Sequence, residues 1–310
     1  MSITQSTPQP ALTSAGWAML LLLGAIWGGS FFFARVAVAE IKPIVLVLER
    51  VAIAAAALQF YLALAGPSFA SAFSHTGRFF VLALLNNVIP FSLIFVGQTQ
   101  MGAGLASVLN ATTPMWTLVV ASLVTTDEKL SWNKLAGIVL GVAGTAVMIG
   151  PGVLAGLGGP VWAKFALIGA SLSYAFALIF ARKQFVGMRP EIVATGQLTA
   201  STVIMIPIVL IAYGPSSLAA GSAMVWAAVI ALALLSTAFA YILYFRILAA
   251  AGATNASLVT LIVPVSAMLL GVLFLGERLE TFEVLGMALI GLGLVTIDGR
   301  LITRRTARNA

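Results

Sequence analysis

The sequence predicts an all-α, polytopic membrane protein with ten transmembrane helices in two inverted five-helix repeats. Hydrophobic residues make up 61% of the 310 positions and charged residues only 8%, whereas a soluble domain carries about 25% charged residues. Apolar stretches of about 20 residues, the length that crosses a bilayer, recur along the chain between short polar breaks. A series of residues also recurs in the same order half a chain later.

Each predicted span is an apolar run bounded by proline, glycine or charged residues. No Lys or Arg precedes Trp17, so we interpret the first run as a permanent span rather than a cleaved signal peptide. The first half is predicted to hold spans at Trp17–Val36, Pro43–Leu64, Phe79–Gly97, Gly104–Thr125 and Trp132–Ile149. The second half is predicted to hold spans at Val161–Arg182, Glu191–Ala212, Val225–Phe245, Ala256–Leu275 and Phe282–Ile297.

The two halves repeat in sequence at a nearly constant offset, which is hard to obtain by chance. Pairs at offsets of 147 to 150 are Ala34-Arg35 with Ala181-Arg182, Pro43 with Pro190, Leu84-Leu85 with Leu234-Leu235, Ala106-Ser107 with Ala256-Ser257, Pro114 with Pro264, Glu128 with Glu277, Gly137 with Gly286, and Gly144 with Gly293. Because each half has an odd number of spans, the second half must sit upside down relative to the first. Inverted repeats of this kind are typical of secondary transporters, whose binding site lies near the midplane between the halves.

Residues 1–16 are expected to form a cytoplasmic tail, 17–150 the first repeat, 160–299 the second repeat and 300–310 a basic cytoplasmic tail. With the N-terminus inside, the cytoplasmic ends carry Arg78, Lys129, Lys134, Arg182, Lys183, Arg189, Arg246, Arg300, Arg304, Arg305 and Arg308. The opposite ends carry only Arg35, Lys42, Lys164 and Arg278. The positive-inside rule therefore predicts a multi-pass protein of a bacterial-type inner membrane, with both termini in the cytoplasm.

Composition argues against several functional classes. The chain has no cysteine, which excludes disulfides, thiolate metal sites and cysteine nucleophiles. The single histidine, His75, falls in the loop after the second span, and carboxylate clusters are absent, so we expect neither an enzyme nor a cofactor or metal site. Membrane orientation explains the net charge of +7 better than nucleic-acid binding does. The expected partners are the lipid bilayer and a small-molecule substrate.

Polar side chains inside the spans indicate where a cavity lies, because they are costly in lipid. They gather on the first, third, fourth, sixth, eighth and ninth spans. The fifth and tenth offer small residues that allow close packing, and we interpret these two spans as scaffold. The predicted substrate-binding residues are Trp27, Asn86, Asn87, Asn110, Thr113, Ser173, Tyr174, Ser236, Tyr241 and Thr260. Three purely structural interpretations stay open: Ser and Thr can hydrogen-bond the backbone of their own helix, Asn can bridge neighbouring helices, and Trp27 can pack in the core.

Pro114 and Pro264 lie at mid-span and at matching repeat positions. Each removes a backbone hydrogen bond and frees the carbonyl four residues earlier, at Asn110 and Thr260. We predict that these prolines act in gating, since a kinked helix can bend between two shapes. A static kink is the alternative. Pro90 and Pro207 have no such matched partner and are interpreted as ordinary kinks.

One ionised pair, Glu49 and Arg50, falls inside a span. Arg50 can attract a substrate carboxylate, neutralise a helix C-terminus, or snorkel toward the outer interface. Adjacent residues project apart on a helix, so the pair is not expected to close on itself. No Asp, Glu or His falls clearly at the midplane, so a proton-relay carboxylate of the usual sort is not expected and proton coupling stays open.

Several segments resemble a known family. LFLGERLETFEVLGMALIGLGLV, from Leu273 to Val295, resembles the end of an EamA domain of the drug/metabolite transporter superfamily, where a span ends in G-E-R-L before a glycine-rich helix. A weaker copy, TDEKLSWNKLAGIVLGVAGTAV, runs from Thr126 to Val147. The opening LLLGAIWGGSFFFARVAV is similar to the W-G-S start of the family, and VLERVAIA around Arg50 is similar to its second-helix arginine motif.

This resemblance implies ten spans around a central cavity and export of amino acids or related small metabolites by alternating access. The pattern is similar to bacterial amino-acid exporters, including the aromatic amino-acid type. Ala111 and Thr113 stand where large aromatics would precede the proline of the fourth span, which favours a broader range of amino acids. The alternative is a carrier of the same superfamily for sugar-nucleotides, drugs or lipid precursors.

Overall fold

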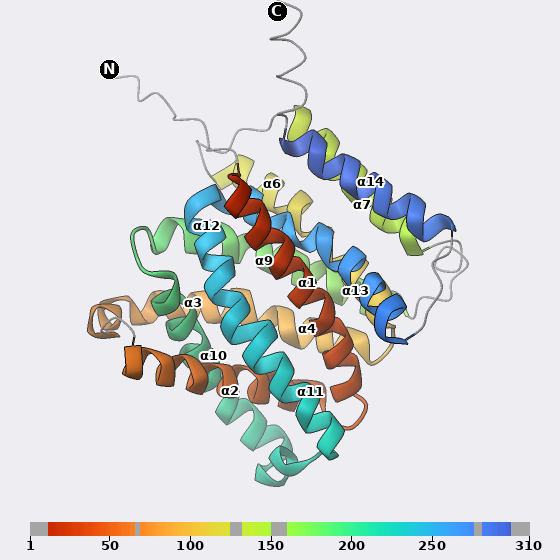
Figure 1. The fold of residues 1–310 in the computed structure, drawn as a ribbon. Coiled ribbons are helices and arrows are strands. Elements are labelled where there is room, and N and C mark those ends of the chain that lie inside the picture. The colour runs from red at the N-terminus through yellow and green to blue at the C-terminus, as the bar shows by residue number, and fades with distance from the viewer. Residues whose placement is uncertain (1–11, 66–68, 125–131, 150–159, 276–280, 299–310) are drawn as a thin grey trace, which may run out of the picture.

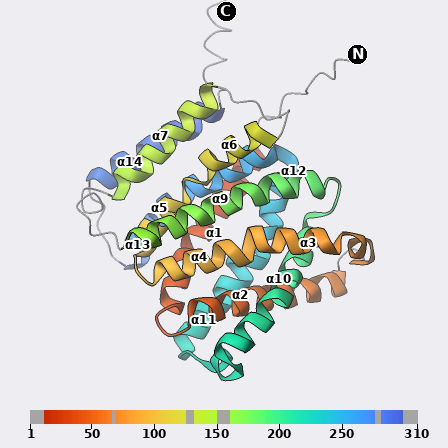
Figure 2. The same cartoon turned by 180° about the vertical axis from the view of Figure 1, so that it is seen from behind.

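The computed structural model of this chain describes residues 12–65, 69–124, 132–149, 160–275 and 281–298. All regular structure within these residues is helical. Seven helical segments there are long and apolar enough to cross a membrane, from Ser14–Ala37 to Ala223–Ser257. Three further helices of 17 or 18 residues bring the number of helical rods in the described chain to ten. Figures 1 and 2 show how the helices are arranged. The predicted fold class is therefore correct.

Some rods consist of more than one helical element. The first half contains α1 (Ser14–Ala37), α2 (Pro43–Ala65), the 3₁₀ helix η1 (Phe69–His75), α3 (Thr76–Ala83), the π-helical turn η2 (Leu84–Val88), α4 (Ile89–Gln98), α5 (Ala103–Asn110), α6 (Thr113–Val124) and α7 (Trp132–Ile149). The second half contains α9 (Val161–Gln184), α10 (Pro190–Tyr213), the 3₁₀ helix η3 (Pro215–Ala219), α11 (Ala223–Ala233), the π-helical turn η4 (Leu234–Phe239), α12 (Ala240–Ser257), α13 (Val259–Leu275) and α14 (Thr281–Asp298).

Local chemistry accounts for several of the helix ends. The Thr13 hydroxyl accepts a hydrogen bond from the Gly16 backbone N–H at 3.1 Å and caps α1, as expected of an N-cap threonine. Pro190 sits in the first turn of α10, where its missing N–H costs nothing. Gly252 has φ of +82°, a conformation that other residues rarely adopt, and it breaks α12 before the chain turns into the next rod.

Three predicted spans differ from the observed helices. The third begins earlier, since the helical segment runs from Ala72 to Gln98. The fourth is split into α5 and α6 at residues 111–112, and the eighth continues past Phe245 to the break at Gly252. The predicted N-terminal tail was 1–16, but α1 already begins at Ser14, and residues 1–11 lie outside the described residues. The predicted tail 300–310, the basic residues Lys129 and Arg278, the pair Glu128 and Glu277, and the G-E-R-L motif at 276–279 also lie outside them.

The helices pack in a pattern that is the same when the two halves are exchanged. The first rod contacts the eighth and the ninth through α1 with α11, α12 and α13, and the sixth rod contacts the third and the fourth through α9 with α4, α5 and α6. The second and seventh rods pair with each other as α2 with α10, and the fifth and tenth pair as α7 with α14. This exchange symmetry is what two structural repeats in one chain produce.

The α7–α14 pair lies along one edge of the bundle (Figures 1 and 2) and is held by close backbone approach. A Cβ added at Gly293 would lie 2.5 Å from the Gly137 carbonyl oxygen, and one added at Gly144 would lie 2.7 Å from that of Gly286. Small residues that let helix backbones touch are a common way to associate helices in lipid. Gly291, on the same helix as Gly293, has open space beside it.

Two π-helical turns lie at equivalent positions of the halves, η2 within the third rod and η4 within the eighth. They begin at Leu84 and Leu234, which are 150 residues apart in the sequence. Pro90 follows η2 closely and cannot supply a backbone N–H, whereas Ala240 follows η4. Proline is therefore not the common cause, and single π turns of this kind occur often at functional sites.

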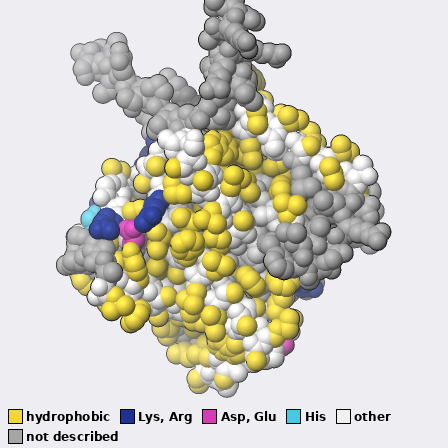
Figure 3. All heavy atoms as spheres, viewed as in Figure 1, with side chains coloured by type: hydrophobic (Ala, Val, Ile, Leu, Met, Phe, Trp, Pro, Cys, Tyr) yellow, Lys and Arg dark blue, Asp and Glu magenta, His cyan; other side chains and the backbone are white. Residues whose placement is uncertain are grey.

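Large apolar side chains cover the outside of the described bundle, including Leu64, Leu123 and Ile211 at 71%, 80% and 86% exposure. Figure 3 shows this cover on one face, with the few charged side chains in view gathered near its edges. Such a surface suits lipid rather than water.

Candidate functional site

A cavity of about 60 Å³ lies between the two halves, where α1, α2, α4, α9, α12 and α13 meet near the two π turns. No described residue of α7 or α14 lines it, in agreement with a scaffold role for that pair. The volume is room for a few water molecules and is below the 300–1,000 Å³ of pockets that enclose drug-sized ligands.

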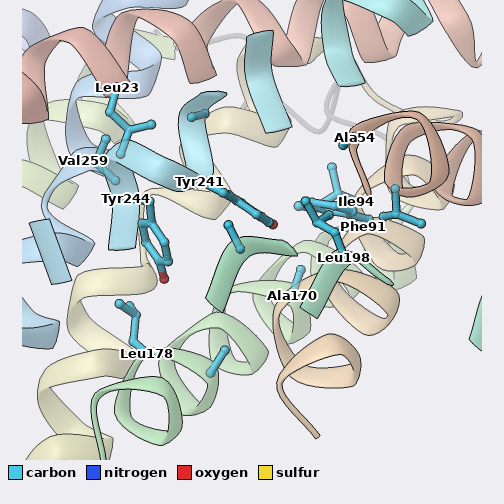
Figure 4. Packing of buried hydrophobic residues seen from close by; sticks show 14 of the residues in the cluster. Leu23, Ala54, Phe91, Ile94, Ala170, Leu178, Leu198, Tyr241, Tyr244 and Val259 are labelled. Carbon is cyan, nitrogen blue, oxygen red and sulfur yellow. The ribbon is translucent and has the colours of Figure 1, made fainter. Parts of the chain in front are cut away.

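Aromatic side chains form much of the cavity wall. The Trp27 ring lies 5.4 Å from that of Tyr244 and 6.5 Å from that of Tyr241, measured between ring centres. Both tyrosines project from α12 into the interior, Tyr241 toward Phe91 and Tyr244 toward Leu178 (Figure 4). Such rings offer a ligand flat apolar surface together with polar N–H and O–H groups.

The first π turn exposes backbone carbonyls that side chains from the second half satisfy. The Ser173 hydroxyl on α9 donates to the Leu85 carbonyl at 2.7 Å. The Tyr241 hydroxyl on α12 donates to the Asn86 carbonyl at 3.4 Å and to Asn87 Oδ1 at 2.5 Å. The third rod is thus held in its π conformation by donors from the opposite repeat.

The second π turn shows the reverse arrangement. The Ser236 carbonyl accepts from Trp27 Nε1 at 3.1 Å and from Arg50 Nη2 at 3.3 Å, and both donors belong to the first half. The Ser236 hydroxyl donates in turn to the Ile26 carbonyl at 3.3 Å. Each half therefore supplies hydrogen-bond donors to the π turn of the other.

Arg50 is buried, with 5% of its surface exposed, and its side chain lines the cavity. Its Nε donates to Thr237 Oγ1 at 2.7 Å, and its guanidinium carbon lies 3.8 Å above the Phe91 ring centre. Snorkelling toward the interface is therefore wrong for this residue. Depth alone could not reveal this, because a long side chain can reach inward as well as outward from a position near a helix end.

Asn86 and Asn87 are both buried, and each donates an amide hydrogen bond to α10. Asn86 Nδ2 lies 3.0 Å from Gln197 Oε1, and Asn87 Nδ2 lies 2.8 Å from Ser201 Oγ. Asn86 lines the cavity, whereas Asn87 is 0% exposed and does not. The helix-bridging interpretation holds for both, and Asn86 bridges helices at the cavity wall.

The fourth and ninth rods bring Asn110, Thr113 and Thr260 to the cavity. The Asn110 carbonyl, which Pro114 frees, accepts from Thr113 Oγ1 at 2.6 Å. A described side chain therefore already occupies this carbonyl. Pro114 stands at the start of α6 beside a helix break, whereas Pro264 lies inside continuous α13.

The structure brings some of the ten predicted binding residues to the cavity and leaves others outside it. Those that line it are Trp27, Asn86, Asn110, Thr113, Tyr174, Tyr241 and Thr260. Asn87, Ser173 and Ser236 lie behind the wall, where their side chains join helices. The lining also includes Tyr244, which sequence reasoning missed, and Arg50, for which a contact with substrate was one of the interpretations left open.

Glu49 is buried within α2, with 5% of its surface exposed. Neither of its carboxylate oxygens has a hydrogen-bond partner among the described residues. A buried carboxylate without partners is costly when ionised. Glu49 is thus a buried carboxylate within a span, although it is not among the residues that line the cavity.

A second hollow, of about 330 Å³, lies where the C-terminal end of α9 and the start of α10 meet α12. Arg182 and Gly252 are among its lining residues. It shares no lining residue with the cavity between the halves. Leu178 of the cavity and Ala181 of this hollow lie one helical turn apart on α9.

Curated relatives of this chain are named as transporters. An uncharacterized transporter, YoaV, of Bacillus subtilis is 25% identical over 87% of this chain and 91% of its own length. An uncharacterized inner membrane transporter, YedA, of Escherichia coli is 27% identical over 90% of this chain and 89% of its own length. A probable terminal-alkyne amino-acid exporter of Streptantibioticus cattleyicolor is 25% identical over 67% of this chain and 68% of its own length. These names agree with the expectation that the chain is not an enzyme.

One crystal structure of a protein matches this fold with a TM-score of 0.72 at 20% sequence identity, and it covers 94% of this chain and 99% of that one. The family model of EamA-like transporters matches twice, over residues 14–150 and 161–297. The chain is therefore a multi-pass membrane transporter and belongs to the EamA-like transporter family of the drug/metabolite transporter superfamily.

Proposed function

We propose that this protein is a secondary transporter that exports amino acids or related small metabolites from the cytoplasm by alternating access. The observation that carries the proposal is the small cavity between the inverted halves, lined by aromatic rings, amides, hydroxyls and one cationic side chain. Such a lining suits a small polar solute with apolar parts. The relative from Streptantibioticus, named a probable amino-acid exporter, supports the same solute class.

The second candidate is a carrier for another solute class of the superfamily, such as sugar-nucleotides, drugs or lipid precursors. A diphosphate needs several cationic or Mg²⁺ contacts, and Arg50 is the one Lys or Arg among the residues that line the described cavity. Relatives such as YoaV and YedA carry no solute in their names. We place amino acids first because the lining holds a single cation and because one relative is named an amino-acid exporter.

We propose that both termini face the cytoplasm, because this topology places eleven basic residues on the cytoplasmic side and four on the opposite side. Under this topology, the hollow at Arg182 and Gly252 lies on the cytoplasmic side of the cavity.

We propose that Pro114 and Pro264 act in gating, each bending a rod of opposite orientation near the cavity. Replacing each with alanine should bias solvent access toward opposite faces, and unchanged access in both variants would leave them as static kinks.

Coupling to protons is best tested at Glu49, because an unpartnered buried carboxylate is a natural place for a proton. In the variant Glu49→Gln the side chain keeps its shape and cannot ionise. If transport is proton-coupled through this group, a pH gradient will drive uptake in the wild type and not in the variant, while counterflow without a gradient persists.

The main test is counterflow in proteoliposomes that hold the purified protein. Vesicles loaded with an unlabelled L-amino acid should accumulate the same labelled amino acid, and empty vesicles should not. A panel of small, branched, sulfur-containing and aromatic amino acids defines the range. Absence of counterflow for every amino acid, together with counterflow for a sugar-nucleotide or a drug, would overturn the proposal in favour of the second candidate.

A further inference from the structure

We propose that Arg50 is the carboxylate subsite of the cavity, so that this transporter selects solutes bearing a single carboxylate group. This inference deepens the proposed function and rests on it for the identity of the solute. The proposal rests on the burial of Arg50, its unused donors, and the neutral residue at the equivalent place in the second repeat.

Arg50 carries its charge in the interior without a protein anion beside it. The residue is 5% exposed, and the adjacent Glu49 does not pair with it, since both Glu49 oxygens lack a partner among the described residues. Elsewhere in the described chain, Glu191 forms ion pairs with Arg189 and Arg246. A buried charge without a counter-ion is unfavourable, and a bound anion would offset that cost.

The guanidinium retains donors for such an anion. It has five N–H donors, and the two bonds it makes are Nε to Thr237 and Nη2 to the Ser236 carbonyl. The Nη1 group therefore has no partner among the described residues. A carboxylate binds the edge of a guanidinium with two parallel hydrogen bonds, and Arg50 belongs to the cavity lining, where a ligand can reach it.

The second repeat shows that this place in the fold does not need a cation. Arg50 lies seven residues after Pro43, and Gln197 lies seven residues after Pro190, so the two are equivalent. Gln197 also contacts the π turn of the opposite rod, through Asn86 at 3.0 Å. A neutral amide thus suffices to join this helix to a π turn. Joining this helix to a π turn therefore gives no reason for the charge of Arg50.

One cation suits a carboxylate better than a phosphate. A phosphate ester carries close to two negative charges at neutral pH, and no other Lys, Arg or His lines the described part of the cavity. The Phe91 ring covers one face of the guanidinium at 3.8 Å, which leaves its edge for a planar group. A single planar anion fits this arrangement.

The test compares acids with their amides in counterflow competition. Proteoliposomes exchange a labelled L-amino acid, and the competitors are L-alanine, L-threonine, L-methionine and L-phenylalanine, each paired with its carboxamide. In the wild type we expect each amide to compete at least tenfold more weakly than its acid. In Arg50→Gln the acids should lose at least tenfold in apparent affinity, so that acid and amide compete alike, whereas Arg50→Lys should keep part of the preference.

Arg35→Gln is the matched control, because Arg35 donates to the Gln98 carbonyl at 2.8 Å and does not line the cavity. It should keep the wild-type preference. A monodisperse size-exclusion profile checks that each variant is folded. If the wild type accepts amides as well as acids, or if folded Arg50→Gln keeps the preference, the carboxylate subsite is wrong.

A second panel separates this inference from the proposed function. L-Lactate and pyruvate each carry a single carboxylate and no amino group. If these alone exchange and Arg50→Gln abolishes their exchange, the carboxylate subsite stands and amino-acid export falls. If no acid of either panel exchanges while an uncharged or phosphorylated solute does, both fall.

Discussion

Replacement of Gly293 by alanine tests whether backbone contact holds the α7–α14 pair. The new Cβ would lie 2.5 Å from the Gly137 carbonyl oxygen and 2.8 Å from the Gly141 nitrogen, whereas ordinary contact begins at 3.4 Å. Both nearest atoms belong to backbone, so rotating a side chain cannot relieve the clash. The two helices must separate by about 0.9 Å at this point, and a gap of about that size forfeits a quarter to a half of each dispersion contact nearby.

The matched control is Gly291→Ala on the same helix, where a Cβ would meet nothing within 4 Å. Both substitutions remove a helical glycine, which favours the alanine variant by about 0.5–1 kcal/mol. Only Gly293→Ala adds the overpacking cost of about 1–3 kcal/mol. The difference between the two variants in free energy of unfolding is therefore expected to be about 1–3 kcal/mol, with Gly293→Ala the less stable.

Reversible unfolding by SDS in mixed micelles, followed by far-ultraviolet circular dichroism, measures that difference. Equal midpoints for the two variants would refute close backbone packing of α7 against α14. Lower stability of Gly291→Ala would show that α14 is rotated about its axis from the arrangement described. Counterflow should persist in both folded variants, because neither helix lines the described cavity.

Three further predictions follow from the site and its surroundings. Thr260 lines the cavity, so Thr260→Cys should react with a membrane-impermeant thiol reagent, and solute should protect it. Asn87 is 0% exposed, so Asn87→Cys should not react. Equal labelling of the two variants would contradict the assignment of the lining residues. Pro264→Ala restores a backbone bond inside α13 and should lower net transport, measured as solute efflux from proteoliposomes, more than solute binding, measured by ligand-induced thermal stabilisation. Wild-type efflux in this variant would contradict a gating role. Arg246→Gln removes the 3.0 Å contact with buried Glu191 and should lower unfolding free energy by about 1 kcal/mol, a value reduced for the half-exposed arginine; an unchanged SDS midpoint would contradict it.

The ten rods could be predicted because hydropathy reports membrane spans directly, and the repeat could be predicted from ordered pairs such as Pro43 and Pro190. The π turns could not. A π turn differs from an α-helix by one residue in the hydrogen-bond ladder, and neither Leu84–Val88 nor Leu234–Phe239 carries a composition that marks it. Their signal was the recurrence of Leu84-Leu85 as Leu234-Leu235, which shows equivalence without showing conformation.

The candidate site was predicted from the depth of each polar residue in the membrane. Depth does not tell which way a side chain points around the helix axis. Asn86 and Asn87 are equally deep, yet only Asn86 lines the cavity. Ser173 was expected in the wall and instead donates to the Leu85 carbonyl, a group that accepts from a side chain because of the unforeseen π turn. Arg50 was judged by its distance from a helix end, and its contact with Thr237, 187 residues later in the chain, was invisible in the sequence.

The hydrogen bonds between the two halves connect solute binding to the interface between the repeats. Trp27 and Arg50 line the cavity and also donate to the Ser236 carbonyl of the second half, while Tyr241 lines it and donates to Asn86 of the first. A solute that hydrogen-bonds to these donors competes with the bonds that join the halves. Alternating access requires the two halves to move relative to each other, so a solute bound to these side chains acts on the contacts that must break during the movement. A solute can shift the equilibrium between two conformations only if its affinity for them differs. Such a difference arises if these donors bond the opposite half in one conformation and the solute in the other.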